Sequence, residues 1–367
     1  MEPAVEVSGS NVSTRPVDRL LVVRLGSMGD IVHTLPAVAA LRRVFPESEF
    51  GWVIEERWTE LLCTPRSLRS GPRNPQRPLI DYIHAVDTKT WRKSLLSAQT
   101  WERVAAGLSE LRARKYQVAV DFQGALRSAL ISRWSGAPIV YGAVQPRENV
   151  ASMFYTRQVM AKGEHVVRQN LALAAAFAGN TLPLPPVSFP VDAASDRSIA
   201  ERLRSEHLER FALLNPGAGW GAKQWPAERY GEVARKLAVQ GLLSLVNFGP
   251  GEEELAETVE KASANTAKRI ECTISELIAV TRHARVFIGG DTGPMHLAAA
   301  LRVPVVAVFG PTNPARNGPF GTRSIVLRSP SSATSHARRT QPDAGLLEIT
   351  SDQVAAAANR LLGSCRG

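Results

Sequence analysis

The sequence contains few cysteines, three among 367 residues. Cys63, Cys272 and Cys365 lie far apart and lack the close spacing of metal-binding cysteines, which argues against a cysteine-ligated metal domain. Three cysteines cannot all pair with one another, so a disulfide framework is not expected either. We therefore expect a protein of the reducing cytoplasm.

Long apolar runs are also missing. No stretch of 18 or more apolar residues is present, so we predict no membrane-spanning helix. The polar first residues lack the apolar segment of a secretory signal, and we expect residues 1–18 to form a disordered tail. With 44% hydrophobic and 21% charged residues, the composition is that of an ordinary soluble protein.

Positive charge is in excess, and it is unevenly distributed. The formal net charge is +10, and residues 1–180 contain 23 Lys and Arg against 16 Asp and Glu, a balance of +7 that leaves +3 for the remainder. This asymmetry favours an anionic ligand or an anionic membrane surface for the first half. Nucleic acid would also be attracted, but no nucleic-acid-binding motif is present, and we expect no such partner.

The length and the order of predicted elements indicate two α/β domains. A chain of 367 residues exceeds what one hydrophobic core usually serves, and strand-like runs alternate with helical ones, which is typical of doubly wound sheets. Residues 63–78, rich in Pro, Arg and Ser, interrupt this pattern and predict a mobile loop. The expected units are a Rossmann-like domain at 19–180, a second at 181–350 after a proline-rich linker at 180–190, and a final helix at 351–367 that could pack back on the first domain.

The predicted strands are distributed over both halves. They lie at residues 20–25, 49–54 and 117–121 in the first half, and near Phe211, Leu243, Val286, Val305 and Ile325 in the second.

A loop at residues 291–296 predicts an anion site. It follows a strand-like run and precedes an apolar helical run, so the backbone N–H groups of Thr292 and Gly293 would be free at a helix start. The helix dipole adds partial positive charge there, and Gly293 lets a ligand approach the backbone. The simpler alternative is that Asp291 caps an ordinary helix.

A second loop, residues 216–226, strengthens that prediction. It contains three glycines and Lys223 directly after the strand-like residues 211–215, an arrangement that resembles a phosphate cradle. The ammonium of Lys223 could lie beside a pyrophosphate, where charge-assisted hydrogen bonds are strong. The alternative is that the glycines only form tight turns.

Asp30 lies at a third strand-to-helix turn, between the strand-like residues 20–25 and an amphipathic run at 31–44. A carboxylate there faces the edge where open α/β sheets bind ligands. It could be a helix cap, kept ionised by the dipole, or a general base.

These loops, in this order, resemble the lipopolysaccharide heptosyltransferases of glycosyltransferase family nine, and among them the heptosyltransferase I group. The resemblance extends from about residue 20 to about residue 362. Its motifs are Gly26-Ser27-Met28-Gly29-Asp30-Ile31-Val32-His33-Thr34-Leu35-Pro36, Trp52-Val53-Ile54-Glu55-Glu56, Asp121-Phe122-Gln123-Gly124, Lys223-Gln224-Trp225-Pro226, Asp291-Thr292-Gly293 with His296, and Phe309-Gly310-Pro311-Thr312-Asn313-Pro314.

The resemblance implies a GT-B architecture, in which two Rossmann-like domains face a central cleft, and an enzyme that moves heptose from ADP-heptose to Kdo of lipid A. The acceptor hydroxyl would lose its proton to the catalytic base Asp30, and one displacement would invert the anomeric centre. The resemblance also assigns donor-binding roles to Lys223, Glu252, Asp291, Thr292, Gly293 and His296. Glu253 is the alternative to Glu252 for the ribose hydroxyls.

Three polar residues of the first half are candidates for binding the acceptor. Gln123, Arg127 and Arg147 are candidates for the acceptor's anionic groups, although isolated arginines are more often only solvated. The sequence has no Asp-x-Asp pair and no clustered His or Cys ligands, so we expect no metal and no cofactor. The expected partners are ADP-heptose, Kdo-lipid A and the anionic inner membrane, with the protein peripheral on its cytoplasmic face.

Two alternatives remain. One is heptosyltransferase II or another family-nine transferase that uses a different acceptor. The other is a nucleotide-sugar-binding protein without transfer activity, or an epimerase of similar architecture. The joint presence of Asp30, Lys223 and Asp291 favours a transferase over a protein that only binds.

Overall fold

The computed structural model describes residues 17–93, 97–335, 337 and 339–363. The tail expected at 1–18 lies outside this range except for its last two residues, and Cys365 lies outside it as well. Val17 packs against the hydrophobic core, and the first strand begins at Arg19.

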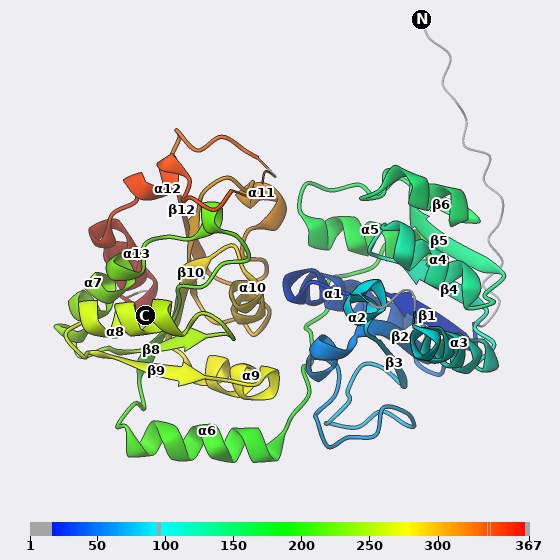
Figure 1. The fold of residues 1–367 in the computed structure, drawn as a ribbon, viewed down its shortest axis with the longest axis horizontal. Helices are drawn as coiled ribbons and strands as arrows, with labels where there is room; N and C mark the ends of the chain where they lie inside the picture. Colours follow the sequence, from blue (N-terminus) through cyan, green and yellow to red (C-terminus); the bar gives the residue numbers. More distant parts are fainter. Residues whose placement is uncertain (1–16, 94–96, 336, 338, 364–367) are drawn as a thin grey trace, which may run out of the picture.

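The described residues form two parallel sheets of six strands each, one in each half of the chain (Figure 1). The N-terminal sheet has the order β3-β2-β1-β4-β5-β6, and the C-terminal sheet has the order β12-β11-β10-β7-β8-β9. In both, the chain starts in the middle, builds outward to one edge and then returns to the other. This is the doubly wound arrangement of Rossmann-like domains, which confirms the predicted α/β GT-B fold.

The strand bounds are as follows. β1 is Arg19–Val23, β2 Glu49–Glu55, β3 Tyr82–Val86, β4 Val118–Asp121, β5 Ile139–Ala143, β6 Arg157–Val159, β7 Phe211–Asn215, β8 Leu243–Phe248, β9 Ala267–Glu271, β10 Val286–Gly290, β11 Val305–Phe309 and β12 Ser324–Arg328.

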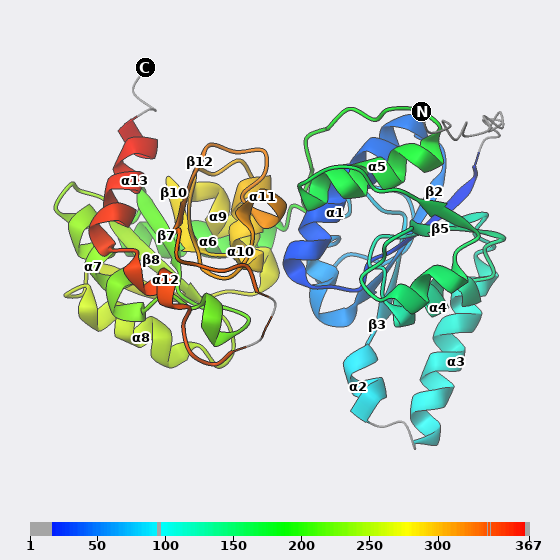
Figure 2. The ribbon, with the colours of Figure 1, turned by 90° about the horizontal axis from the view of Figure 1, so that it is seen from above.

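Helices cover both faces of the two sheets (Figures 1 and 2). In the first half α2 and α3 extend away from the sheet, as Figure 2 shows. The helices are α1 Met28–Val44, α2 Thr88–Lys93, α3 Ala98–Ala113, α4 Leu126–Trp134, α5 Val166–Ala178, α6 Ala193–Ser205, α7 Ala227–Ala238, α8 Glu253–Ala262, α9 Ile274–His283, α10 Gly293–Ala300, α11 Pro314–Asn317, α12 Ala344–Glu348 and α13 Ser351–Gly363. Short 3-10 segments occur at η1 Glu56–Leu61, η2 Asn149–Phe154 and η3 Gly221–Lys223.

The central strands form where the sequence is apolar on both faces. β7 and β10 are buried along their whole length, as expected for parallel strands covered by helices on each side. The edge strand β9 was not predicted, because only two of its five residues are buried and its sequence AKRIE shows no apolar run. β3, β5 and β6 were not predicted either; β6 has only three residues, RQV, and β3 and β5 are only partly buried.

The final helix lies on the C-terminal sheet, so the expectation that it packs back on the first domain is wrong. Val354, Ala358 and Leu361 of α13 are buried in the same core cluster as Trp225. The physical reason is chain length: only two residues, 349 and 350, separate α12 from α13, and the helix cannot return to the first half over that distance.

The loop at residues 63–78 is tied down by hydrogen bonds. The buried guanidinium of Arg77 donates to the backbone carbonyls of Leu68, Gly71, Pro72 and Ile80. These bonds close the loop on itself, which the sequence pattern alone did not predict.

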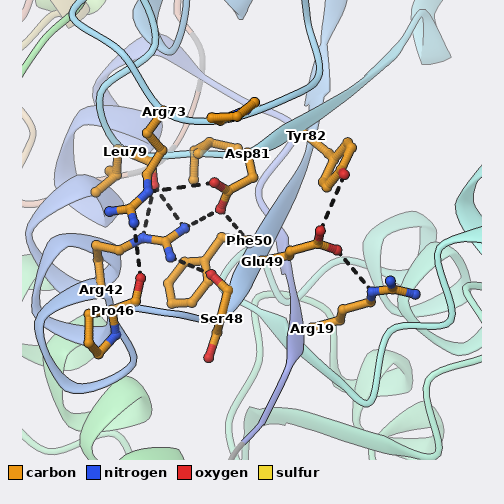
Figure 3. A network of polar contacts seen from close by, with 12 residues as sticks. Arg19, Arg42, Pro46, Ser48, Glu49, Phe50, Arg73, Leu79, Asp81 and Tyr82 are labelled. Atoms are coloured by element: carbon orange, nitrogen blue, oxygen red, sulfur yellow. Dashed lines mark hydrogen bonds and ion pairs between the residues drawn. The ribbon is translucent and has the colours of Figure 1, made fainter.

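Asp81, just beyond this loop, connects it to the sheet (Figure 3). Its carboxylate forms ion pairs with Arg42 of α1 and with Arg73, and it accepts a 2.8 Å hydrogen bond from the Phe50 amide of β2. The loop is therefore joined to both a helix and a strand of the N-terminal half.

Among the described residues, no helix is both long enough and apolar enough to cross a membrane.

Candidate functional site

Asp30 lies in the first turn of α1, which follows a short loop after β1. Ser27 is the N-cap residue, so the alternative in which Asp30 is itself the cap is not what the structure shows. The Asp30 carboxylate accepts hydrogen bonds from the Ser27 amide at 3.0 Å and the Ser27 hydroxyl at 3.2 Å. It also forms an ion pair with Arg24, at 2.7 Å between Nη2 and Oδ1, and its side chain remains 33% exposed.

The surroundings of Asp30 keep it ionised. Burial by itself favours the neutral acid, but the Arg24 guanidinium, the Ser27 hydrogen bonds and Arg147 together outweigh burial and lower the pKa of Asp30 below its ordinary value. At neutral pH the group is therefore a carboxylate, with an exposed edge that could accept a proton.

A buried network holds the next loop of the sheet beside Arg24. Arg24 also donates a hydrogen bond to the Phe122 carbonyl. The Gln123 side-chain oxygen accepts a 2.8 Å hydrogen bond from the Leu25 amide. The Asp121 carboxylate accepts the Gln123 amide at 2.8 Å. Gln123 is thus held at the carboxyl end of β1, next to the base.

Asp121 anchors this loop from beneath. Besides Gln123 it accepts the Gly124 amide at 3.2 Å and the hydroxyls of Ser128 and Tyr155, each at 2.8 Å. Burial raises the pKa of Asp121, while these four donors oppose the rise.

The two candidate acceptor arginines occupy different positions. Arg147 is exposed and close enough to Asp30 to lower the pKa of its carboxyl group. A Cβ on Gly124, whose φ is +66°, would approach the Arg147 amide to 2.9 Å, so only glycine lets these two loops meet. Arg127 lies farther along the sheet edge and donates to Thr88 Oγ1 at 3.1 Å, at the start of α2.

Lys223 and Asp291 are paired across the C-terminal sheet edge. The Lys223 ammonium lies 2.6 Å from Asp291 Oδ2, and His296 Nε2 lies 3.1 Å from Asp291 Oδ1. Burial opposes ionisation of Asp291, but His296 and Lys223 outweigh it and hold the pKa of that carboxyl well below its usual range. The three side chains that the sequence singled out therefore form one polar cluster.

The start of α10 has the predicted form of an anion site. Thr292, rather than Asp291, is the N-cap residue, and Pro294 occupies the first turn, where its missing N–H costs nothing. The amides of Thr292 and Gly293 find no backbone acceptor in the part of the chain that the structure describes. They point out of a helix N-terminus, where an anion is favoured.

Glu252 lies against the glycine-rich loop, whereas Glu253 is exposed. The Glu252 carboxylate accepts the Gly249 amide at 2.9 Å, and a Cβ on Gly217 would overlap that carboxylate. Burial raises the pKa of Glu252 above its ordinary value. Glu253 instead caps the Gly251 amide in solvent, so the geometry favours Glu252 over Glu253 as the ligand-facing carboxylate.

The two halves of the chain meet through the starts of α1 and α10 (Figures 1 and 2). A Cβ on Gly29 would come within 2.5 Å of the His296 ring, and a Cβ on Gly293 would come within 2.7 Å of the Met28 sulfur. The residues next to Asp30 and the residues next to Asp291 are therefore in direct contact.

Two further histidines, His33 and His165, extend this contact, although the sequence indicated no role for either. The rings of His33 and His296 lie edge to face with centroids 4.1 Å apart, and His165 lies 5.5 Å from His33. His165 in turn lies 3.0 Å from the Gly318 carbonyl of the second half. Burial, reinforced by the neighbouring histidines, lowers the pKa of His33 well below its ordinary value.

No group of three or more His, Cys, Asp or Glu side chains in the described ranges is arranged to hold a metal ion.

Comparisons with known proteins identify the family of this chain. Residues 104–346 match the model of glycosyltransferase family 9 (heptosyltransferase). Lipopolysaccharide heptosyltransferase 1 of Pseudomonas aeruginosa is 30% identical over 318 residues, which cover 85% of this chain and 84% of that protein.

Solved structures agree as well. E. coli heptosyltransferase WaaC with ADP superimposes with a TM-score of 0.75 at 27% identity, covering 94% of this chain and 99% of that one. The same enzyme with ADP-2-deoxy-2-fluoro heptose gives a TM-score of 0.73 at 26% identity, covering 93% and 99%.

Proposed function

Because this chain belongs to glycosyltransferase family 9, we propose that it transfers heptose from ADP-L-glycero-D-manno-heptose to Kdo of lipid A, in the synthesis of the lipopolysaccharide inner core. In this proposal residues 19–180 bind the acceptor and residues 181–350 bind the donor. The observation that carries it is the contact between the helix start next to Asp30 and the helix start next to Asp291, because it brings a carboxylate base and an anion site together across the two halves.

Asp30 is the general base of the proposed reaction. Its carboxylate takes the proton of the acceptor hydroxyl, the acceptor oxygen bonds to the anomeric carbon, and the bond from that carbon to the phosphate oxygen breaks. ADP leaves with the electron pair. Attack from the face opposite the phosphate inverts the anomeric centre. Arg24 keeps Asp30 ionised and turned toward the end of β1.

The leaving pyrophosphate is stabilised by groups that are already in place. Lys223 has three N–H donors and uses two on Asp291, one on Oδ2 at 2.6 Å and one on the backbone carbonyl at 3.4 Å, so one remains for a phosphate oxygen. The Thr292 and Gly293 amides add the positive end of α10, and His296 orients Asp291. Since these donors carry the charge of the leaving group, the proposed transfer needs no metal. EDTA should leave the rate unchanged, and loss of activity that Mg²⁺ restores would contradict this account.

Glu252 is proposed to bind the adenosine ribose. Its half-buried carboxylate lies against Gly217 of the glycine-rich loop at residues 216–226. One carboxylate oxygen accepts the Gly249 amide, and the other is available to accept hydrogen bonds from the ribose hydroxyls.

Gln123, Arg127 and Arg147 are proposed to meet the anionic acceptor. Gln123 and Arg147 lie beside Asp30, and Arg127 lies next to Thr88 at the same edge of the sheet. Their positions would bring the carboxylate or phosphate groups of an acceptor within reach of the base.

The proposed location is the cytoplasm, peripheral on the inner membrane. The +7 balance of residues 1–180 belongs to the half that carries Asp30, and the acceptor is anchored in lipid. Binding to anionic vesicles should be lost in 1 M salt, where the Debye length is about 3 Å. Co-sedimentation that is equal on neutral vesicles, or that survives 1 M salt, would contradict the proposal. We propose no nucleic-acid partner.

One experiment separates the alternatives. Release of ADP is measured with ADP-heptose and with other nucleotide sugars, each in the presence and absence of Kdo-lipid A. The proposed function requires release that depends on both ADP-heptose and Kdo-lipid A. Release only with a core that already carries heptose would indicate heptosyltransferase II or a related enzyme. Donor binding without ADP release under any condition would leave a binding protein or an epimerase.

A further inference from the structure

An arginine precedes each of four neighbouring strands in the C-terminal sheet. The strands are adjacent in the order β12-β11-β10-β7. Arg323, Arg285 and Arg210 come directly before β12, β10 and β7, and Arg302 lies three residues before the first residue of β11. Since all four strands are parallel, the arginines lie at the amino edge of the sheet, opposite the edge that carries Lys223 and Asp291.

These arginines line one concave pocket. Neighbouring strands are about 4.8 Å apart, so the outer two of these four strands lie roughly 14 Å apart. The pocket has a volume of about 710 Å³ and is closed on one side by the end of α13. Among the described residues, no Asp or Glu lines the pocket. Its charged lining is therefore entirely positive, which attracts anions.

Three of the four arginines are not neutralised by the protein. Arg210, Arg285 and Arg302 are exposed and form no ion pair with any carboxylate among the described residues. Guanidinium groups that line one pocket repel one another, and an anion in the pocket would relieve the repulsion.

Arg302 occupies a position where glycine is usual. It follows α10 in the left-handed backbone region, with φ +62°, and its amide bonds to the Ala299 carbonyl while the Val303 amide bonds to the Ala298 carbonyl. This is the Schellman ending of a helix, which glycine forms without strain and arginine does not. The side chain is thus present at a conformational cost, which points to a use for it.

We propose that this pocket binds the phosphate groups of an anionic ligand, at a site separate from the sugar-donor site. Arginine suits such a ligand because its planar fork of donors matches phosphate oxygens. Leu242 and Pro304 add apolar surface, and the side-chain oxygen of Asn359 is buried without a partner among the described residues, so an organic group next to the phosphate would find both kinds of contact. The inference uses none of the residues of the proposed transfer reaction and stands independently of it.

Titration calorimetry with tripolyphosphate tests the proposal. The measurement uses the full chain carrying Lys223→Ala, which removes the charged donor of the donor site and leaves the remainder of that site the same in every variant. The pocket variant adds Arg285→Ala with Arg302→Ala. The matched control adds Arg197→Ala with Arg235→Ala, which removes the same charge from exposed positions outside the pocket. We expect the pocket variant to bind at least tenfold more weakly and the control to bind as before.

Vesicles distinguish the source of the phosphate. The same variants are sedimented with vesicles of phosphatidylglycerol and of phosphatidylcholine. A pocket-specific loss confined to phosphatidylglycerol vesicles assigns the phosphate to a lipid headgroup, and a pocket-specific loss of tripolyphosphate assigns it to a soluble ligand. Either result supports the pocket. Equal behaviour of the pocket and control variants in both assays overturns it.

Discussion

Replacing Asp30 with asparagine separates its proposed chemistry from its place in the helix. The substitution keeps the size and one oxygen of the side chain but removes the charge and the ability to take a proton. The introduced carboxamide can still accept from Arg24 or from Ser27, but its NH₂ group must then face the other donor. We expect kcat to fall by about 10² or more, because general bases typically contribute on the order of 10² to 10⁴.

The expected cost in stability is small by comparison. A hydrogen bond to a charged group contributes about 1.5–3 kcal/mol when it is buried. The Asp30 side chain is 33% exposed, and solvent screens its pair with Arg24. We therefore expect the free energy of unfolding to fall by about 1–2 kcal/mol, which leaves a folded protein. Affinity for ADP should be unchanged, since the base touches the acceptor and the anomeric carbon rather than the nucleotide.

The matched control is Asp192→Asn. Asp192 caps α6 and accepts from the Ser195 amide at 3.3 Å and the Ser195 hydroxyl at 2.6 Å, as Asp30 does from Ser27, but it forms no ion pair with an arginine among the described residues. Steady-state rates, ADP titration and urea unfolding are measured on both variants. If Asp30→Asn keeps wild-type turnover, or if both variants lose activity in proportion to stability, Asp30 is only a helix-start residue and the proposed mechanism fails.

Three further outcomes are expected. Lys223→Ala should weaken ADP binding by about 1.5–3 kcal/mol, the value of one charged hydrogen bond, and unchanged affinity in calorimetry would remove Lys223 from the donor site. Gly217→Ala should also weaken ADP, because the added methyl group displaces the Glu252 carboxylate, while Gly219→Ala in the same loop meets nothing within 4 Å and serves as the control; equal effects would contradict the assignment of Glu252. Lowering the pH from 7.5 to 5.5 should lower the free energy of unfolding, because burial depresses the pKa of His33 in the folded protein. Below about pH 6.5 the unfolded chain takes up a proton on this residue that the folded chain does not. The free energy of unfolding then falls by about 1.4 kcal/mol for each pH unit. A His33→Asn variant whose stability falls as steeply as that of the wild type would refute this origin.

The strand-loop-helix units of the site could be predicted because each is local in sequence. An apolar run, a glycine or proline and a helical run lie within about a dozen residues around both Asp30 and Asp291, and the resulting helix starts formed as expected. The edge strands β6 and β9 did not have this signal, because their residues are mixed and at most two in each strand are buried.

The burial and the ion pair of Arg24 could not be predicted from its neighbours in the sequence. In the sequence it belongs to an apolar strand-like run, and nothing nearby indicates that it would be buried against the Phe122 carbonyl, 98 positions away, and paired with Asp30. His165 is similar, since its partner Gly318 is 153 positions away. The first contact depends on how strands β1 and β4 pair within one half and the second on how the two halves are placed, and a single sequence has no periodicity that encodes either. The position of α13 depends on α12, a five-residue helix that was not predicted, because the connection of two residues after it keeps α13 on the C-terminal sheet.

The contacts of Gly29 with His296 and of Gly293 with Met28 have a mechanical consequence. Because neither glycine carries a side chain, the main chain at each helix start lies directly against a side chain of the other half, Gly29 against the His296 ring and Gly293 against Met28. A shift of one half against the other would therefore change these contacts together with the distance between the acceptor oxygen and the anomeric carbon, where a misplacement of about 1 Å can cost on the order of 10² in rate. A methyl group added at Gly29 would have to displace the His296 ring or separate the two helix starts, and we expect it to slow the enzyme although Asp30, Lys223 and Asp291 are all retained.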